Sequence, residues 1–405
     1  MQEIERIQFS ERLEKYKDKH IIKVITGIRR CGKSTLLKMF RNKLLKNGVQ
    51  ENQIIYLNFE YFDNYELLNP KNLHDYIKNH LVKDKMNYIF LDEIQNVKEF
   101  QRVIDSIFLN DNADIYITGS NAYLLSGELA TLLSGRYVTI EMLPLSFKEF
   151  FQTQKNLSRT EIYRLYVELS SFPYALNFLE DEKGTFERKA VLDYLSGVYS
   201  TIVLKDVVLR EKISDTKMLE SVVRFIFDSI GNPISSKKIA DTMTSSGRKI
   251  DTKTVEKYLS ALQESFIIYE AKRYDAKGKT YLKLLEKYYA ADIGLRFLLL
   301  GQKANDVGHI LENVVYLELI RRGYSVFVGK VDDTEIDFVA QNSQGNTYIQ
   351  VSASVRDENT LKRELRPLQA LNDNYPKILL TLDEDPDCDY NGIQKRNVLD
   401  WLLEY

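Results

Sequence analysis

The sequence predicts an α/β protein whose first 150 residues form a parallel sheet covered by helices on both faces. Short runs rich in β-branched and aromatic residues alternate there with segments of helical periodicity. A loop containing two glycines separates the first of these runs from the first long helix. Strands that alternate with helices imply right-handed crossovers, and therefore a parallel sheet with helices on its faces.

The elements of this first block can be assigned in order. A packing helix is predicted over 4–16, where apolar residues recur at near-helical intervals. Strands are expected at the runs IIKVIT, IIYLNF, NYIFLD, DIYIT and YVTIEM. Helices are expected between them at 33–47, 71–83, 97–109 and 121–133. The segment PLSFKEF closes the block, which we assign to residues 1–150.

The rest of the chain predicts three further domains, since one core rarely serves more than roughly 250 to 300 residues. Residues 151–230 show helical spacing, with a turn or helix start at Pro173. Residues 231–282 predict a short helix, a turn, a second helix and a hairpin with Gly278 at its tip, the order of a winged helix-turn-helix. Residues 283–405 combine a helix with several strands and predict a separate α/β domain.

Composition limits the functions that the chain can perform. The formal net charge of -2 gives no overall attraction to nucleic acid or to an anionic membrane, so such binding would need a local patch. No apolar run reaches the roughly 18 residues that span a bilayer, and we expect no membrane association. The only two cysteines, Cys31 and Cys388, exclude a disulfide framework and lack zinc-ligand spacing, so we expect a cytoplasmic protein.

The loop between the first strand and the first long helix has the pattern of a phosphate-binding loop. Glycines let the backbone fold closely around an anion, so that N–H groups and the start of a helix face the phosphates. Lys33 would contact the β- and γ-phosphates, Ser34 would bind Mg²⁺, and Thr35 would touch the α-phosphate. The predicted nucleotide-binding residues are Gly27, Ile28, Arg29, Arg30, Cys31, Gly32, Lys33, Ser34 and Thr35.

Two carboxylates follow the apolar run YIFL at the end of the third predicted strand. Ligands of open parallel sheets collect at the carboxyl ends of the strands. Asp92 is therefore predicted to hold the Mg²⁺ shell together with Ser34, and Glu93 to orient and deprotonate the attacking water.

Four other residues remain open between a catalytic and a structural role. Asn121 or Ser120, after the fourth strand, could sense the γ-phosphate or simply cap a helix. Arg136, just before the fifth strand, could reach a phosphate of its own or a neighbouring subunit, or make a surface contact. Glu60 ends the second strand at the same edge and is either part of the site or solvated.

The motifs RRCGKST, FLDEIQ, ITGSN, LLSGR and PLSFKEF, in this order, resemble prokaryotic ATPases related to the AAA class. The resemblance covers essentially the whole chain. It implies ATP and Mg²⁺ as ligands, hydrolysis of ATP, a helical lid over 151–230, a winged helix, and a C-terminal domain of unknown function. It also implies that nucleotide state is coupled to a poorly defined partner, and it leaves a homo-oligomer open.

The predicted winged helix is locally basic. Residues 233–281 contain ten Lys and Arg against six Asp and Glu, a local charge of +4. This patch could neutralise phosphates of double-stranded DNA, with an affinity that falls steeply with salt. The alternative is a surface that docks a protein, since Glu256 and Glu264 dilute the charge of the second helix. We therefore expect an ATP-driven conformational switch that acts on DNA, or alternatively on a protein partner.

The C-terminal domain resembles a restriction-endonuclease-like core. Glu312, Asp337 and the strand around Gln350 and Ser352 follow the order of that fold. Active nucleases carry a carboxylate and a lysine where this chain has Gln350 and Ser352. A neutral amide is a poor Mg²⁺ ligand and serine supplies no cation, so we expect a version that does not cleave.

Overall fold

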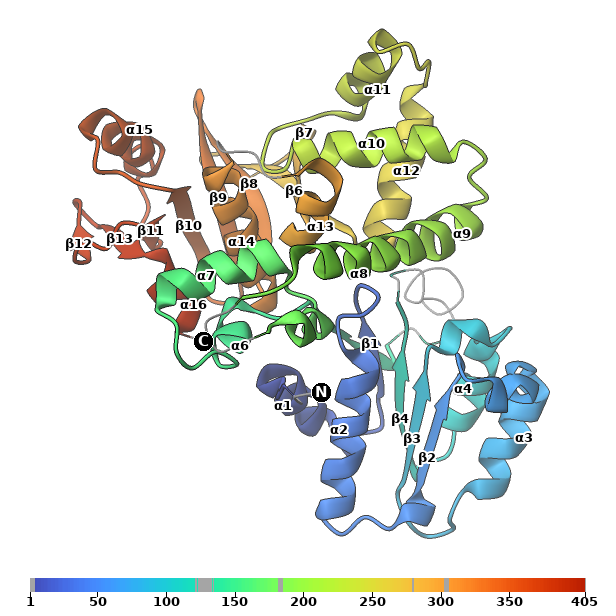
Figure 1. Ribbon diagram of the computed structural model, residues 1–405. Coiled ribbons are helices and arrows are strands. Elements are labelled where there is room, and N and C mark those ends of the chain that lie inside the picture. The colour runs from blue at the N-terminus through green and yellow to red at the C-terminus, as the bar shows by residue number, and fades with distance from the viewer. Residues whose placement is uncertain are drawn as a thin grey trace. The chain divides into compact units, whose positions relative to one another are not determined.

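The computed structural model describes residues 4–120, 122, 133, 135–180, 185–278, 280–301 and 306–404 (Figure 1). The chain divides into two compact units. The first comprises Met1–Pro144 with Glu264–Phe266, and the second comprises Leu145–Gln263 with Ile267–Tyr405. Among the described residues, no helix combines the length and the apolar composition that crossing a bilayer requires.

The first unit contains a five-stranded sheet in the order β2-β3-β4-β1-β5. All neighbouring strands are parallel, so the predicted parallel sheet is confirmed. β1, β3 and β4 are buried along their whole length, as expected of strands covered on both faces. The strands are β1 (Ile22–Thr26), β2 (Ile54–Asn58), β3 (Asn87–Asp92), β4 (Ala113–Thr118) and β5 (Tyr137–Glu141).

The helices of this unit lie close to their predicted positions. The start of α3 has a clear local cause, because the Asn69 side chain accepts the N–H groups of Lys71 and Asn72 and Pro70 occupies the first turn. The helix predicted over 121–133 lies outside the described residues, apart from 122 and 133. The helices are α1 (Ile7–Tyr16), α2 (Lys33–Lys46), α3 (Pro70–His80) and α4 (Phe100–Phe108), with short 3₁₀ segments η1 (Glu51–Gln53), η2 (Phe62–Leu68) and η3 (Ile94–Asn96).

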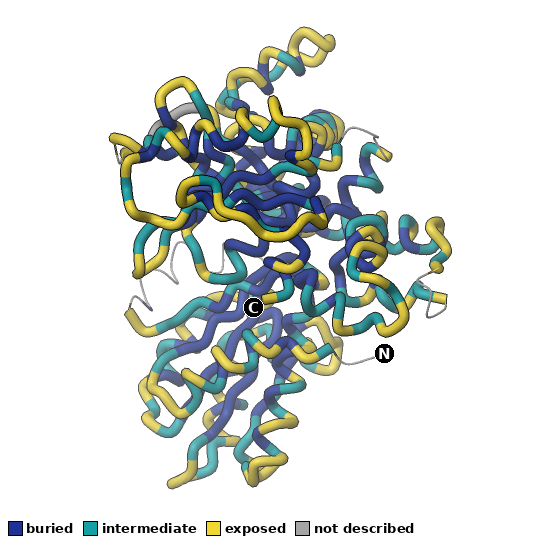
Figure 2. Tube along the Cα trace, turned by 90° about the vertical axis from the view of Figure 1, so that its left-hand side faces the viewer, coloured by how far each residue is buried: buried dark blue, intermediate teal, exposed yellow. Residues whose placement is uncertain are grey.

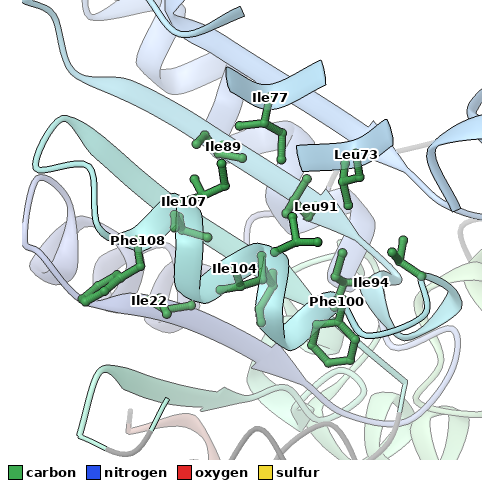
Figure 3. Close-up of a cluster of buried hydrophobic side chains, with 14 of the residues drawn as sticks. Ile22, Leu73, Ile77, Ile89, Leu91, Ile94, Phe100, Ile104, Ile107 and Phe108 are labelled. Carbon is green, nitrogen blue, oxygen red and sulfur yellow. The ribbon is translucent and has the colours of Figure 1, made fainter. Parts of the chain in front are cut away.

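The core on one face of this sheet is formed by α3 and α4. Figure 3 shows Leu73 and Ile77 of α3 and Ile104 of α4 packed against Ile89 and Leu91 of β3. Each of these side chains is fully buried. The apolar residues of α3 and α4 recur at helical spacing, so each helix turns one continuous stripe towards the strands.

The second unit begins with helices, as predicted for 151–230. A 3₁₀ segment begins at Pro173, where the sequence predicts a turn or a helix start. The helical elements up to the first strand are α6 (Phe147–Phe151), α7 (Arg159–Leu169), η5 (Pro173–Phe178), α8 (Arg188–Thr201), the π-helix η6 (Ile202–Val208), α9 (Leu209–Glu211), α10 (Thr216–Asp228), α11 (Ser236–Ser245) and α12 (Thr252–Glu264).

An eight-stranded sheet forms the centre of the second unit, in the order β12-β13-β11-β10-β9-β8-β6-β7. The helices that accompany it are α13 (Ile293–Leu300), α14 (Val307–Arg321), α15 (Glu358–Gln369) and α16 (Val398–Leu403). Its strands are β6 (Ile268–Asp275), β7 (Thr280–Ala290), β8 (Ser325–Val331), β9 (Thr334–Asn342), β10 (Gly345–Ser352), β11 (Lys377–Thr381), β12 (Cys388–Asp389) and β13 (Ile393–Asn397). These strands are buried only in part, since β10 is buried from 348 to 351 whereas both residues of β12 are exposed, and Figure 2 colours buried, intermediate and exposed stretches separately.

The hairpin predicted as a wing belongs to this larger sheet. The order helix, helix, hairpin is present as α11, α12, β6 and β7. However, β6 also pairs in parallel with β8, through Arg273, Tyr274 and Asp275. The proposed boundary after residue 282 therefore falls inside β7, and the hairpin shares a sheet with the strands that follow it.

Candidate functional site

The loop between β1 and α2 has a backbone that requires glycine at both ends. Gly27 has a φ of 141°, and a Cβ atom there would lie 2.1 Å from the main-chain oxygen of Met142. Gly32, directly before α2, has a φ of 108°, which L side chains rarely adopt. The loop therefore folds tightly against its neighbours and leads directly into the amino-terminal end of α2.

Lys33 points back into this loop and is 3% exposed. Its Nζ atom donates to the main-chain oxygens of Gly27, at 2.9 Å, and Ile28, at 3.2 Å. The same atom lies 4.0 Å from Oε1 of Glu93. The ammonium group is thus inside the concave loop, where an anion surrounded by N–H groups would meet it. Thr35, by contrast, is exposed on the first turn of α2.

Asp92, the last residue of β3, is fully buried and held by four side chains. Its Oδ1 atom accepts from Ser34 Oγ at 3.0 Å and from Thr118 Oγ1 at 2.6 Å. Its Oδ2 atom accepts from Asn58 Nδ2 at 2.6 Å and from Tyr56 OH at 3.3 Å. Burial raises the pKa of Asp92, and the hydrogen bonds from Thr118 and Ser34 oppose that rise. The carboxylate is therefore fixed in orientation beside the loop.

The pair formed by Ser34 and Asp92 fits a Mg²⁺ site. The two oxygens lie 3.0 Å apart at the edge of the loop, so both can face one cation. Mg²⁺ prefers oxygen ligands, and it is commonly bound by one or two protein oxygens together with water and phosphate. Cys31 is fully buried, and burial raises the pKa of its thiol, so this side chain supplies no thiolate ligand.

Glu93 has an unusual backbone conformation that directs its side chain to the same place. Its φ of 55° lies in the left-handed region, and its N–H donates to Thr118 Oγ1 at 2.9 Å. The carboxylate is 6% exposed, and its Oε2 atom accepts from Gln95 Nε2 at 2.5 Å. A carboxylate so placed beside Lys33 can orient and deprotonate a water molecule.

Of the two candidate residues after the fourth strand, the structure describes Ser120. Ser120 is buried, and its Oγ atom lies 3.4 Å from Arg29 Nη2 and 3.5 Å from Gln95 Nε2. Arg29 also donates to Glu60 Oε1 at 2.8 Å. These contacts bring Ser120 and Glu60 to the edge that carries the loop. Asn121 lies outside the described residues, so its expected role stays a prediction.

Arg136 lies at the amino-terminal ends of the strands, away from the loop. Its main-chain oxygen accepts from the N–H of Ile22, the first residue of β1, whereas the loop follows the last residue of that strand. Five residues of strand separate these ends by about 16 Å. The guanidinium pairs with Asp105 and lies 5.7 Å from the ring of Phe108. The interpretation of Arg136 as a finger within its own chain is therefore wrong, and an action on a neighbouring subunit stays a prediction.

Sequence reasoning missed the residues that position the two carboxylates. Asn58 ends β2, Thr118 ends β4, and Gln95 follows Glu93 by two positions. These residues form no motif, since they come from separate segments of the chain. One feature of the sequence could have identified Asn58 and Thr118: each is the polar last residue of an otherwise mostly apolar strand, and these two strands are the neighbours of β3.

A second cluster of charges occurs in the second unit, around Lys287 of β7. Its Nζ atom is 2.9 Å from Glu312 Oε1, 2.7 Å from Glu335 Oε1 and 3.8 Å from Asp337 Oδ1. Burial by itself lowers the pKa of Lys287, but these carboxylates raise it above its ordinary value. The fold thus brings Glu312 and Asp337 together, as the predicted order implies, and adds a lysine that the sequence pattern did not identify.

The two positions on β10 do not supply a metal ligand set. Gln350 accepts the N–H of Asp337 at 3.2 Å and donates to Glu364 Oε2 at 2.7 Å. Ser352 donates instead to the main-chain oxygen of Ser354 at 3.1 Å. Within the described part of the chain, no group of three or more His, Cys, Asp and Glu residues is arranged to hold a metal ion.

Comparisons with known proteins agree with this architecture. A family model described as an AAA domain matches residues 19–151, and a model described as a domain of unknown function matches 160–306. The solved structure of a Walker-type ATPase of Pyrococcus abyssi has a TM-score of 0.52 with this chain at 18% identity. The match covers 73% of this chain and 96% of that one, and it supports the fold.

Two relatives share most of the sequence. An uncharacterized protein of Haemophilus influenzae is 41% identical over 411 residues, which cover 99% of each chain. An uncharacterized protein of Methanocaldococcus jannaschii is 32% identical over 363 residues, which cover 85% of this chain and 77% of that protein. The chain therefore belongs to one family with these two proteins, and its first unit carries the AAA-related P-loop domain.

Proposed function

We propose that this protein binds ATP with Mg²⁺, hydrolyses it, and uses the change of nucleotide state to alter its contact with a macromolecule. The observation that carries the proposal is the convergence of Lys33, Ser34, Asp92 and Glu93 at the carboxyl ends of β1 and β3. A nucleotide can shift a conformational equilibrium only if it binds one arrangement more tightly than the other.

Each residue of the site has a separate role in this proposal. Lys33 exchanges its main-chain acceptors for the β- and γ-phosphates, and the loop N–H groups surround the same anion. Ser34 and Asp92 hold Mg²⁺, which neutralises negative charge on the phosphate oxygens when it is bound. Glu93 takes a proton from the attacking water, and Gln95 holds the Glu93 carboxylate in position.

Calorimetry of Mg·ATP binding tests the nucleotide part. The parent chain is expected to bind, Lys33→Ala to bind much more weakly, and Lys38→Ala to bind like the parent. Lys38 is the matched control because it is an exposed lysine of the same helix, 3.5 Å from the hydroxyl of Tyr61. The absence of heat with the folded parent chain would refute the proposal.

Double-stranded DNA is our preferred macromolecule, with residues 233–281 as its contact surface. Exposed basic side chains on α11, α12 and their surroundings support this choice. They are Lys237, Lys238, Lys249, Lys253 and Lys272. Binding of a labelled duplex should weaken steeply with salt, and the steepness should fall in Lys237→Ala/Lys253→Ala because fewer phosphates are neutralised. No binding at low salt would remove DNA from the proposal.

A protein partner is the second candidate, and two observations favour it. Four other basic residues of the region are engaged within the chain: Arg248 with Lys217 and Ser221, Lys257 with Glu211, Arg273 with Glu335, and Lys277 with Asp332. In the first unit, η2 and the residue before it expose the aromatic side chains of Tyr61, Phe62 and Tyr65. Exposed apolar groups of this kind are typical of protein contacts. A stable protein partner in a pull-down, with weak and salt-insensitive DNA binding, would select this candidate.

We also infer that the C-terminal sheet does not cleave DNA. The ammonium of Lys287 lies among the carboxylates that a metal ion would need, and the amide of Gln350 cannot replace an anionic ligand. Incubation of the chain with duplex DNA and Mg²⁺ should leave the DNA intact. Sustained cutting that disappears in Asp337→Ala would overturn this inference.

A further inference from the structure

Arg6 is buried against the back of the phosphate-binding loop. It directly precedes α1, is 4% exposed, and its guanidinium carbon lies 4.9 Å from the ring centroid of Phe9. A guanidinium is planar and carries five N–H donors in a fixed arrangement. Such a group can hold several main-chain oxygens in one geometry, provided that they surround it.

The acceptors of Arg6 come from two distant segments of the first unit. Nη1 donates to the main-chain oxygen of Cys31, inside the loop, at 3.1 Å. Nη2 donates to the main-chain oxygens of Leu143 at 2.8 Å and Pro144 at 3.3 Å. Pro144 is the last residue of this unit before the chain continues into the second one. One side chain therefore joins the loop to the segment by which the chain leaves the unit.

The contact with Cys31 has a direct consequence for phosphate binding. In a planar trans peptide, the carbonyl of one residue and the N–H of the next point in opposite directions. Because Arg6 holds the carbonyl of Cys31, the N–H of Gly32 must point away from Arg6. Gly32 is the N-cap of α2, where N–H groups of a P-loop meet a phosphate. Arg6 thus fixes the orientation of one anion-binding N–H without touching the anion.

The exit segment also contacts the start of the loop. The N–H of Met142 donates to the main-chain oxygen of Thr26 at 2.8 Å, and the oxygen of Met142 lies only 2.1 Å from where a Cβ atom of Gly27 would be. The loop is therefore in contact with residues 142–144 at its beginning, and is linked to them through Arg6 near its end. A rotation of the peptide between Cys31 and Gly32 would change the hydrogen bonding of the whole guanidinium.

We propose that Arg6 is a positioning residue that holds the Gly32 N–H towards the phosphates and couples nucleotide occupancy to residues 142–144. The proposal rests on the ATP binding proposed above. The Gly32 N–H contacts the phosphates both in bound ATP and in the transition state. Arg6 therefore stabilises the two states about equally, which affects ATP binding more than the rate of the chemical step. Its loss raises the KM for ATP and leaves kcat nearly unchanged. Partial unfolding would instead lower the apparent kcat and leave KM unchanged, because a smaller fraction of the protein molecules would be active.

The experiment compares Arg6→Met with Arg12→Met and Arg6→Lys. Arg12 is the matched control, since it lies on α1 and donates to the main-chain oxygen of Thr139 in β5, outside the loop, at 3.0 Å. Arg6→Met should raise the Kd and KM for Mg·ATP by roughly tenfold, as expected for loss of a buried hydrogen-bonded charge. Arg12→Met should stay within about twofold of the parent chain. Arg6→Lys should lie between them, because an ammonium cannot span both segments in the same geometry.

Hydrogen exchange reports the second half of the proposal. Mg·ATP should slow exchange of the Met142 and Leu143 amides in the parent chain, and should not do so in Arg6→Met saturated with nucleotide. A folded Arg6→Met or Arg6→Lys with unchanged Kd and KM would overturn the positioning role while the ATPase stands. Persistent slowing in Arg6→Met would overturn the coupling. A parent chain that binds no Mg·ATP would remove both proposals together.

Discussion

Replacement of Lys287 by methionine is expected to destabilise the second unit strongly and in a pH-dependent way. The lysine side chain is 3% exposed and lies within 4 Å of three carboxylates. Their side chains are 9% exposed for Glu312, 13% for Asp337 and 29% for Glu335. Methionine has a similar length and packs in an apolar environment, but it supplies no charge. The variant therefore tests the charge of Lys287 separately from the volume of its side chain.

The size of the effect follows from the burial of the carboxylates. Removal of one partner from a buried ion pair costs about 3 to 5 kcal/mol, because the other charge stays buried without compensation. Glu312 and Asp337 are buried enough for this range to apply, whereas Glu335 reaches solvent and contributes less. We expect a loss of about 3 to 5 kcal/mol in the free energy of unfolding near pH 8.

The sign of the pH dependence comes from Asp337. Burial and then Glu312 raise the pKa of this carboxyl well above its ordinary value, and Lys287 acts against that rise. Without Lys287 the folded-state pKa rises further. A carboxyl with a raised folded-state pKa stabilises the fold below its unfolded-state pKa, and this contribution is lost as pH rises through the folded-state value. The deficit of Lys287→Met should therefore be largest at alkaline pH and shrink on acidification.

The single tryptophan gives a direct assay of this unit. Trp401 is buried in α16, so urea unfolding followed by its fluorescence reports the second unit. Lys277→Met is the control, since Lys277 forms an exposed pair with Asp332 after β6 and its loss should cost less than about 1 kcal/mol. Equal losses in the two variants, or a Lys287→Met deficit that is the same at about pH 5.5 and about pH 8.5, would refute the reasoning.

Three further predictions concern the first unit. Glu93→Gln should keep Mg·ATP affinity but lower turnover by roughly 10² to 10⁴ in single-turnover phosphate release, because water activation is lost, and an unchanged rate would show that its role is wrong. Thr118→Val should lower turnover by roughly 10 to 100-fold because Asp92 and the Glu93 N–H lose a shared hydroxyl, whereas Thr118→Ser should restore it. If Arg136 acts on a neighbouring subunit, Arg136→Ala should lose activity that mixing with Asp92→Ala restores. If mixing restores no activity, Arg136 does not act between subunits, and its role is structural, through its contacts with Asp105 and Phe108.

The sequence was sufficient for the strands of the first unit and for placing Lys33, Ser34, Asp92 and Glu93 at the carboxyl ends of those strands. Lys33 and Ser34 lie within one loop, and Asp92 and Glu93 are adjacent, so local order places them correctly once the strands are known. Parallel strands then bring their carboxyl ends to one edge.

Contacts between distant segments required the tertiary structure. Arg6 contacts Cys31 and Leu143, and Lys287 contacts Glu312 and Asp337, with no local pattern that could reveal either set. The membership of the β6–β7 hairpin in the larger sheet depends on the pairing of β6 with β8. Local periodicity records which face of an element is buried, whereas strand order and long-range hydrogen bonds depend on how the whole chain satisfies its buried polar groups.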